Sequence, residues 1–465
     1  MTAMRSAVLH AVNDLRVEDK EVPEPGPGEV LVRVAVCGVC GSDATEYSRG
    51  PVLTVMPVTL GHEFVGTVAA IGPGVTSPPV GATVVCGAGI SCGECKPCRQ
   101  GRTNLCRNYT TIGLQHDGGL AGFVTAPVGT LLDVSDSGLS LDTLGLSQPM
   151  SIAVHAVRRS GLRSGQDAVI VGVGGIGAFI TFAAASVGAR VLVVDLNEER
   201  LELASALGAF STLKAGTTSL VDRLEELGMD PDVFFEVSGS APGLASILEA
   251  AKPGATLVPV GIQRGEPSLP LGSWTLREYT IIGTVAHVIK DDLPEAVRLL
   301  GTRADWTDIA SEVLPLDLVL SDGLQPLIDG TAAQIKTLID RHGMIFLKPI
   351  FKGGIDHISH RLFRMGFSTR KAARFHAMAA LAATGSVAVA LTTGPKLLFF
   401  TAFVFAAIGL GLRAMEGREP VRSRRGPPIL RYVSVAVLGL IGLSVPPAAL
   451  AAWDLQRAKT AFLEG

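Results

Sequence analysis

Four cysteines near the start of the chain are spaced as the ligands of one metal ion. They follow the pattern C-x2-C-x2-C-x7-C and are Cys92, Cys95, Cys98 and Cys106. Four thiolates at this spacing surround a tetrahedral Zn²⁺ without ligands from elsewhere, and they leave no position for water or substrate. We therefore expect a structural zinc site. The alternative is an iron–sulfur or redox-active cluster, because four cysteines also suit iron.

A second, looser group combines a cysteine, a histidine and a glutamate. The sequence CGSD begins at Cys40, and the sequence GHE ends in His62 and Glu63. These are ligand types of a catalytic zinc, which uses three protein groups and keeps one position open. Either sequence alone is ordinary, but together they predict a catalytic zinc. Cys37 and Cys86 are then small core residues, and all seven cysteines suit a reducing compartment better than disulfides.

A glycine motif in residues 168–195 predicts a dinucleotide site. Gly172, Gly174 and Gly177 fit G-x-G-x-x-G directly after an apolar run. The first glycine allows a tight turn, the second lets the backbone approach a pyrophosphate, and the third lets the helix pack on the strand. Asp195 ends the next strand, where a carboxylate would hold the adenosine ribose and repel a 2′-phosphate, which favours NAD over NADP. The backbone of this turn is supplied by Gly172, Gly174, Gly175, Ile176 and Gly177.

Two kinds of structure must position these groups. Residues 1–150 alternate apolar and polar residues between Pro-Gly turns, as in Glu29–Val36, which predicts a compact, partly open β-barrel. After Asp195, strands at 233–237, 256–260 and 280–283 and helices at 197–207 and 244–251 predict a parallel sheet covered on both faces.

Several residues near these elements have weaker signals. Ser238 and Gly261 follow two strands of the predicted sheet, so they are either cofactor contacts or plain turns. We interpret His155 and His287 as structural.

With these motifs in place, the chain resembles the zinc-dependent medium-chain alcohol dehydrogenases, most of all the butanediol and sorbitol (polyol) branch. The resemblance runs from about Met1 to Asp340 and is carried by CGVCGSD, EYSRGPV, LGHEFVGTV, the four-cysteine lobe, QPMSIAVHAV and the glycine turn. It implies a GroES-like catalytic domain (1–150), a Rossmann NAD-binding domain (151–289) and a return segment (290–343) that completes the first. It also implies two zinc ions, one catalytic and one structural, and that Asp195 with Arg200 holds the adenosine end of NAD.

Two positions depart from the family pattern. Gln148 stands where relatives usually have glutamate, and Thr45 stands where many have histidine. A glutamine oxygen can still bind zinc or orient a zinc-bound water, so the fourth ligand is either Gln148 or water. Thr45 cannot titrate near neutral pH, so a proton path there must use water or the cofactor ribose. The implied reaction is alcohol oxidation, with Ser42 relaying the proton and the nicotinamide accepting the hydride.

The chain continues beyond the end of the resemblance with apolar runs at 377–393, 397–412 and 429–453. We expect a basic amphipathic linker (344–375) on an anionic membrane surface and a three-helix transmembrane region (376–465). The positive flanks place the dehydrogenase domains on the cytoplasmic side. The alternatives are a solvated basic linker, and a buried helical core or a misread C-terminus.

The formal net charge of −3 gives no whole-chain attraction to nucleic acid. The leading hypothesis is a membrane-tethered, NAD-linked zinc dehydrogenase of a small secondary alcohol, diol or polyol. The resemblance also implies a homo-oligomer, a dimer or tetramer. The alternatives are L-threonine- or glucose-dehydrogenase-type specificity, and a membrane-anchored NAD-binding sensor or scaffold with weakened catalysis.

Overall fold

The computed structural model describes residues 3–263, 265, 269–310 and 313–340. The chain separates into two compact units, Met1–Pro349 and Ile350–Gly465, and the described residues all lie in the first. The predicted basic linker (344–375) and transmembrane region (376–465) lie outside the described residues. Among the described residues, no helix is both long enough and apolar enough to cross a bilayer.

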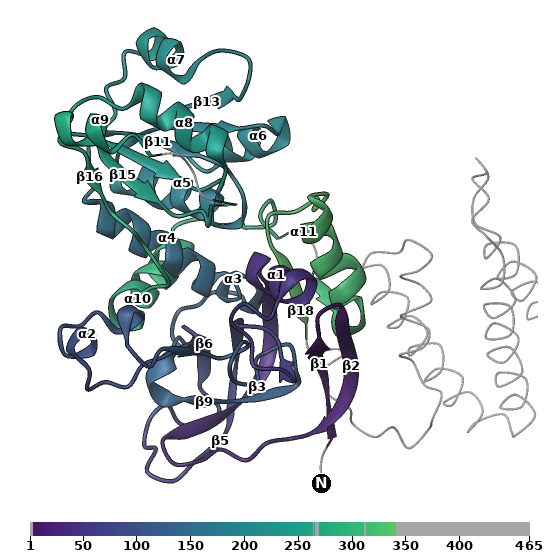
Figure 1. The fold of residues 1–465 in the computed structure, drawn as a ribbon. Helices are drawn as coiled ribbons and strands as arrows, with labels where there is room; N and C mark the ends of the chain where they lie inside the picture. Colours follow the sequence, from purple (N-terminus) through teal and green to yellow (C-terminus); the bar gives the residue numbers. More distant parts are fainter. Residues whose placement is uncertain (1–2, 264, 266–268, 311–312, 341–465) are drawn as a thin grey trace, which may run out of the picture. The chain divides into compact units, whose positions relative to one another are not determined.

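The N-terminal part is built around strand β3 (Glu29–Val39), which is almost wholly buried (Figure 1). It pairs antiparallel with β5 (Glu63–Ile71), with β9 (Phe123–Pro127) and with β18 (Thr337–Asp340). In the β3–β5 register Gly38 lies opposite Glu63. The chain segments that carry Cys40 and His62 therefore lie at the same end of this strand pair, although they are far apart in sequence.

The remaining strands of this part form one large sheet and two small ones. The seven-stranded sheet has the order β10-β6-β5-β3-β18-β17, with β9 also on β3, and the small sheets are β2-β1-β4 and β7-β8. The bounds are β1 (Ala3–Ala11), β2 (Asp14–Glu21), β4 (Val58–Thr59), β6 (Thr83–Cys86), β7 (Gly89–Ile90), β8 (Thr110–Thr111), β10 (Leu131–Asp133) and β17 (Val313–Pro315).

The cofactor part is a six-stranded parallel sheet in the order β13-β12-β11-β14-β15-β16. Its strands are β11 (Asp167–Val171), β12 (Arg190–Asp195), β13 (Ser211–Lys214), β14 (Val233–Glu236), β15 (Thr256–Pro259) and β16 (Thr280–Ile281). All of β11 is buried, as expected for a strand covered on both faces. The strand order reverses at β11, between β12 and β14, so a crevice opens at the carboxyl end of β11.

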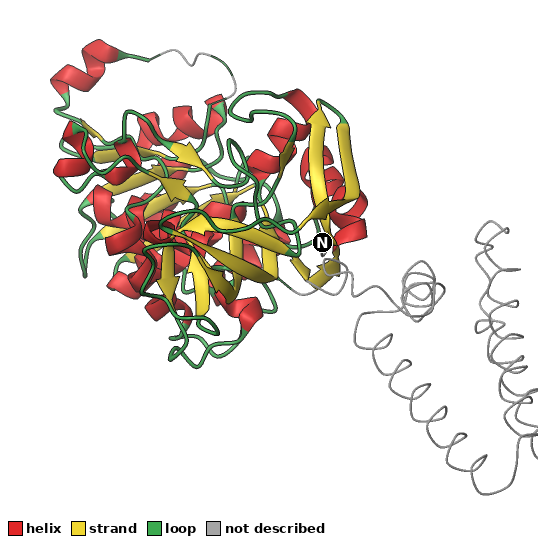
Figure 2. Ribbon diagram, turned by 90° about the horizontal axis from the view of Figure 1, so that it is seen from below, coloured by secondary structure: helices red, strands yellow, loops and turns green. Residues whose placement is uncertain are grey.

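Helices cover the parallel sheet and link it to the first part (Figure 2). Helix α4 contacts β5 and β6 of the large sheet as well as β15 and α5, and α10 packs on α4. The helices are α1 (Gly41–Arg49), α2 (Lys96–Arg99), α3 (Leu141–Leu144), α4 (Ser147–Ser160), α5 (Gly175–Val187), α6 (Glu198–Ala206), α7 (Leu220–Leu227), α8 (Ala241–Ala250), α9 (Leu271–Leu276), α10 (Ile289–Leu300) and α11 (Gln325–Asp329). Short turns are η1 (Thr103–Leu105), η2 (Val128–Thr130), η3 (Leu316–Leu318) and the π-helix η4 (Val319–Leu324).

Candidate functional site

The structure brings together the three residues predicted to hold a catalytic metal. One ligand atom from each of Cys40, His62 and Glu63 lies within 4.8 Å of the other two. Cys40 caps the N-terminus of α1, while His62 directly precedes β5 and Glu63 begins it; these two side chains are 7% and 1% exposed. Apart from the ion pair with Lys336, neither Glu63 oxygen has a partner among the described residues, which leaves lone pairs for a cation. A thiol, an imidazole and a buried carboxylate at this separation fit Zn²⁺.

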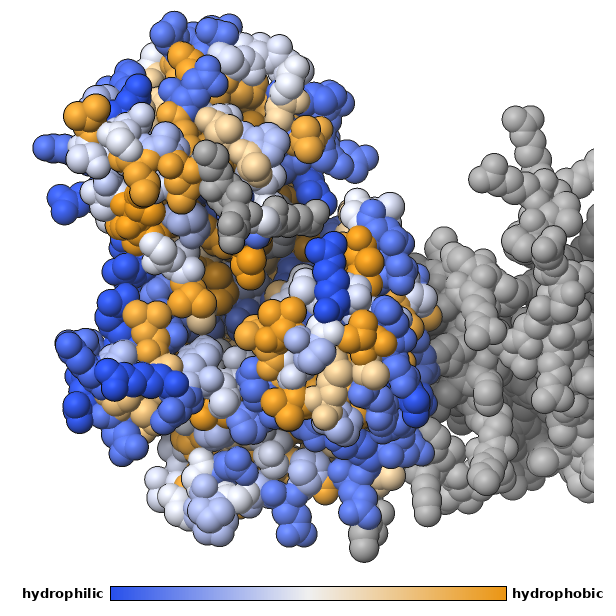
Figure 3. All heavy atoms as spheres, in the orientation of Figure 1, coloured by the Kyte–Doolittle hydropathy of each residue, from blue (hydrophilic) through white to orange (hydrophobic). Residues whose placement is uncertain are grey.

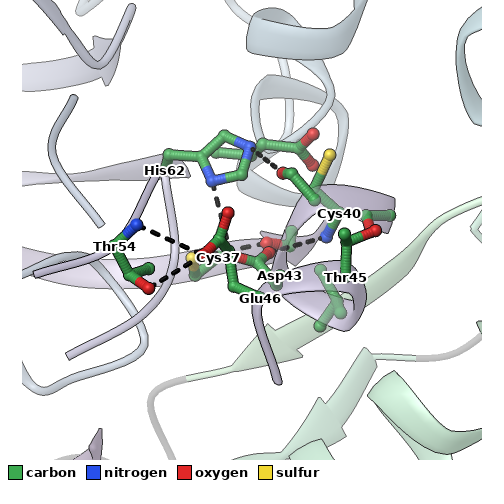
Figure 4. A network of polar contacts seen from close by, with 12 residues as sticks. Cys37, Cys40, Asp43, Thr45, Glu46, Thr54 and His62 are labelled. Carbon is green, nitrogen blue, oxygen red and sulfur yellow. Dashed lines mark hydrogen bonds and ion pairs between the residues drawn. The ribbon is translucent and has the colours of Figure 1, made fainter. Parts of the chain in front are cut away.

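Asp43 orients the histidine of this group, a role that the sequence did not assign (Figure 4). The Asp43 side chain is fully buried; its Oδ2 accepts a hydrogen bond from the Cys40 amide at 2.9 Å, and its Oδ1 lies 3.5 Å from His62 Nδ1. This leaves Nε2 of His62 for a metal, 3.4 Å from Ser42 Oγ. Burial alone would lower the pKa of His62, but Asp43 and Cys40 outweigh burial and raise that pKa well above its ordinary value.

Lys336 neutralises the glutamate from the far end of the described chain. Its Nζ lies 2.5 Å from Glu63 Oε2 and donates to the Val39 carbonyl at 3.2 Å. Both charged side chains are almost completely buried. Burial would lower the pKa of Lys336, but Glu63 and Cys40 raise it, so the ammonium is charged. Nothing in the local sequence indicated this contact, because pairing of β18 with β3 creates it.

The four cysteines predicted to hold a structural zinc also converge. Their Sγ atoms are 3.4 Å apart for Cys95–Cys98, 3.9 Å for Cys95–Cys106 and 3.5 Å for Cys92–Cys106. Zinc–thiolate bonds of about 2.3 Å in a tetrahedron require sulfur–sulfur distances of about 3.8 Å. Without a cation, backbone donors lower the pKa of Cys95 to about 6 while burial raises that of Cys98 to about 12. A divalent ion would let all four ionise together.

The other cysteines lie apart from this lobe, as predicted. All seven cysteines are free thiols, and Cys37 and Cys86 are buried in the core of the large sheet. Burial raises the pKa of Cys86 to about 12. Both are therefore inert packing residues.

The glycine turn has the geometry that each predicted glycine role requires. Gly172 has φ +102°, and a Cβ there would lie 2.8 Å from the Ser238 amide nitrogen. A Cβ on Gly177 would lie 1.9 Å from the Gly172 carbonyl oxygen, so helix and strand pack tightly there. No atom of the described residues lies within 4 Å of a Cβ built on Gly174, which caps α5. That open space, with Gly175 and Ile176 in the first turn, suits a phosphate.

Acidic side chains hold the backbone at the ends of the two strands that flank β11. Asp195 accepts hydrogen bonds from the Val173 amide (2.7 Å) and the Asn197 amide (2.9 Å). On the other side Glu236, which the sequence analysis missed, is 2% exposed and accepts from Ser238 Oγ (2.5 Å) and Gln263 Nε2 (2.6 Å).

The two candidates that follow strands lie at the same crevice. The Gly261 amide donates to the Glu236 carbonyl at 2.9 Å, and the Ser238 amide is the atom nearest to a Cβ built on Gly172. Ser238 and Gly261 therefore lie at the carboxyl ends of β14 and β15, where ligands of parallel sheets bind.

Three other residues make contacts that leave their predicted roles open. The Gln148 carbonyl accepts from Ser151 Oγ at 2.6 Å, and its side chain makes no hydrogen bond to the three ligands within the described residues. The Arg200 amide donates to Asn197 Oδ1, and Thr45 Oγ1 donates to the Gly41 carbonyl. A zinc contact by Gln148 and a cofactor contact by Arg200 remain predictions.

Comparison with known proteins agrees with this geometry. The model of the alcohol dehydrogenase GroES-like domain matches residues 26–136, and that of the zinc-binding dehydrogenases matches residues 175–302. D-xylulose reductase A of Aspergillus niger is 31% identical over 294 residues, which cover 61% of this chain and 82% of the relative. The structure of 2R,3R-butanediol dehydrogenase from Bacillus subtilis superimposes with a TM-score of 0.67 and 30% identity, covering 72% of this chain and 99% of the other.

A zinc-binding dehydrogenase of Sinorhizobium meliloti bound to NADP gives a TM-score of 0.68 and 29% identity, covering 73% of this chain and 100% of the other. These matches confirm the GroES-like and Rossmann-type parts of the predicted fold. The chain belongs to the zinc-type medium-chain alcohol dehydrogenase family.

Proposed function

We propose that this protein oxidises a small secondary alcohol, diol or polyol with NAD and returns the carbonyl compound. The observation that carries the proposal is the convergence of Cys40, His62 and Glu63 on one point, with Asp43 and Lys336 fixing the histidine and the glutamate. The substrate class is supported by similarity to a butanediol dehydrogenase and a xylulose reductase.

Each residue of the site has a separate task. A zinc ion held by Cys40, His62 and Glu63 supplies a Lewis acid that makes a bound hydroxyl more acidic, and NAD supplies the hydride acceptor. Ser42 Oγ, next to His62 Nε2, receives the hydroxyl proton and passes it toward solvent. Asp43 holds the imidazole tautomer that has Nε2 free for the metal.

The cofactor preference rests on Asp195 at the end of β12. Its carboxylate braces the glycine turn and repels a 2′-phosphate, which favours NAD. One relative is bound to NADP, so membership of the family does not by itself set the preference. Turnover with NAD and with NADP at equal concentrations tests the preference, and a preference for NADP would contradict this role of Asp195.

Two alternatives keep specific support. L-threonine- or glucose-dehydrogenase-type specificity fits the uncharged Gln148. An NAD-binding sensor or scaffold fits Thr45, whose hydroxyl donates a hydrogen bond within its own helix.

We also propose membrane tethering through residues 376–465 with the dehydrogenase on the cytoplasmic side. Membrane fractionation of the full chain tests it, and recovery in the soluble fraction without detergent would contradict it.

A homo-oligomer is proposed on the exposed edge of the parallel sheet. Figure 3 shows apolar side chains gathered on the surface over α9, β15 and β16. Ile262, Leu271 and Leu276 are 94%, 63% and 87% exposed. A second copy would remove this apolar surface from water. Light scattering of the detergent-solubilised chain measures the assembly, and a monomer at all concentrations would contradict it.

The central experiment separates catalysis from cofactor binding. The zinc-loaded full chain is assayed for NADH formation on a panel of diols, polyols and amino alcohols. It is compared with Cys40→Ala and with Cys37→Ala, a buried cysteine that is not a ligand. We expect Cys40→Ala to lose one zinc per chain and about 10³-fold or more in turnover while retaining NAD binding. NAD binding by the wild-type protein without turnover of any alcohol would favour the scaffold alternative.

A further inference from the structure

The segment that leads from the cofactor sheet back to the first part makes few hydrogen bonds of its own. This crossing segment, residues 284–288, follows β16 and ends at α10. Ala286 has a positive φ of 50°, unusual for a residue other than glycine. Within the part of the chain that the structure describes, both ring nitrogens of the buried His287 and the Thr284 hydroxyl oxygen lack a hydrogen-bond partner. The position of this segment must therefore be fixed by groups from other elements.

One such group is Asn104, which belongs to the four-cysteine lobe. Asn104 lies in η1, between the ligands Cys98 and Cys106, and is 8% exposed. Its Nδ2 donates to the Val285 carbonyl at 2.9 Å and lies 3.4 Å from His155 Nε2. The two amide protons therefore have one acceptor each, one in the crossing segment and one in α4.

The far side of His155 completes the connection. His155 Nδ1 lies 2.8 Å from Asp292 Oδ2, and the Asp292 side chain is fully buried in the first turn of α10. A carboxylate at this distance makes Nδ1 the protonated nitrogen, so Nε2 accepts from Asn104. The same carboxylate accepts from the Val288 amide at 2.6 Å. The crossing segment is thus held at Val285 by the lobe and at Val288 by α10.

We propose that Asn104 is a positioning residue. Through it, the zinc-filled cysteine lobe holds the crossing segment in place. The crossing segment in turn sets the position of the cofactor sheet relative to the chain segments that carry Cys40 and His62. This inference rests on the proposed hydride transfer, since donor and acceptor carbons belong to the two parts that the segment joins. Hydride transfer requires these atoms within about 3.5 Å, so a small displacement costs a large factor in rate.

The zinc enters because it closes the loop that presents Asn104. Cys98 and Cys106 flank that loop, and their common ion would fix both ends of it. When the ion leaves, the two ends of the loop are no longer held to a common point. The carboxamide then loses its fixed place, and the Val285 carbonyl and the buried His155 Nε2 lose their donor.

Amide hydrogen exchange of peptides spanning 283–290, with the zinc content measured alongside, tests this in the full chain. The variants are Asn104→Ala and Asn104→Asp, which keeps the shape but cannot donate, with Gln100→Ala as an exposed amide control in the same lobe. We expect about 10-fold faster exchange in both Asn104 variants at unchanged zinc content. Exchange equal to that of Gln100→Ala would overturn the proposal. If an Asn104 variant loses the ion, the test is made on the wild-type protein with and without its cysteine-bound zinc. Removing that zinc should speed amide exchange at 283–290, and unchanged exchange would overturn the proposal.

Kinetics distinguish positioning from a merely structural role. With a deuterated alcohol, the Asn104 variants should show a lower kcat and a larger isotope effect on kcat, while KM for NAD changes little, because misplaced carbons slow the hydride step. An unchanged isotope effect would show that Asn104 only stabilises the lobe. Absence of turnover in every variant would refute the proposed function, and the exchange measurement would still decide the contact.

Discussion

His287 gives the sharpest prediction about stability because it is a buried base that the fold keeps neutral. The residue is 2% exposed. Its pKa is lowered from 6.5 to about 4, mainly by burial; Asp292 partly opposes the shift and His155 adds to it. Replacing it breaks no hydrogen bond from a described residue to either ring nitrogen. His287→Leu therefore removes a titration at little structural cost.

The sign and size follow from linkage. The unfolded chain binds this proton at its ordinary pKa of 6.5 and the folded chain only near 4. Stability is therefore complete above pH 6.5 and falls as the pH drops through the window between 6.5 and 4. A pKa that is lower by about 2.5 in the folded protein costs about 3 kcal/mol of unfolding free energy once the pH is well below 4, and most of this loss has occurred by about pH 4.5.

Urea unfolding of the wild-type protein, His287→Leu and His116→Leu at about pH 7.5 and about pH 4.5 measures the effect. His116 is exposed, so its variant controls for loss of a histidine as such. Acid also strips zinc, but from all three proteins alike. Between the two pH values, the free energy of unfolding of His287→Leu should fall by about 2.5 kcal/mol less than that of the wild-type protein. For His116→Leu the fall should equal that of the wild-type protein. Equal losses in all three proteins would refute the reasoning.

Two further predictions concern the metal sites. Lys336→Met leaves the buried Glu63 carboxylate without its cation, so the zinc-free protein should lose about 3–5 kcal/mol in urea unfolding, and the zinc-loaded protein less. An equal loss in both forms would show that the metal does not share the charge of Glu63. In zinc-free protein, Cys95, with its pKa near 6, should react with iodoacetamide at neutral pH well before the buried Cys86, with its pKa near 12. Peptide mapping measures both, and zinc should protect Cys95.

The sequence predicted those parts of the site that consist of short, continuous motifs. The strand–turn–helix around Gly172 and the four-cysteine lobe need few distant residues to take shape, so spacing alone indicates them.

The predicted ends of strands and helices were less accurate. The strand expected to reach Val237 ends at Glu236, whose side chain accepts from the amides that follow. The helix expected from Leu244 begins at Ala241, because Ser240 caps it.

Two of the three residues that sequence reasoning missed act on groups far away in the sequence. Lys336 reaches Glu63 only because β18 returns to β3, and no local pattern records that pairing. Glu236 lay inside the predicted strand 233–237, and only the loop after β15 places Gln263 on it. Asp43 alone could have been found, since a carboxylate three residues after a metal-binding cysteine can reach the backbone amide of that cysteine.

The two predicted zinc sites differ in charge, and that difference explains which of them can do chemistry. Four thiolates more than neutralise a divalent ion, so the ion in the cysteine lobe would be a weak Lewis acid with no open position. Cys40 and Glu63 together only balance the ion, and Lys336 draws on the charge of Glu63, so the ion retains its pull on a substrate oxygen. Lys336 is therefore expected to stabilise the buried glutamate and to keep the neighbouring metal electrophilic through the same contact.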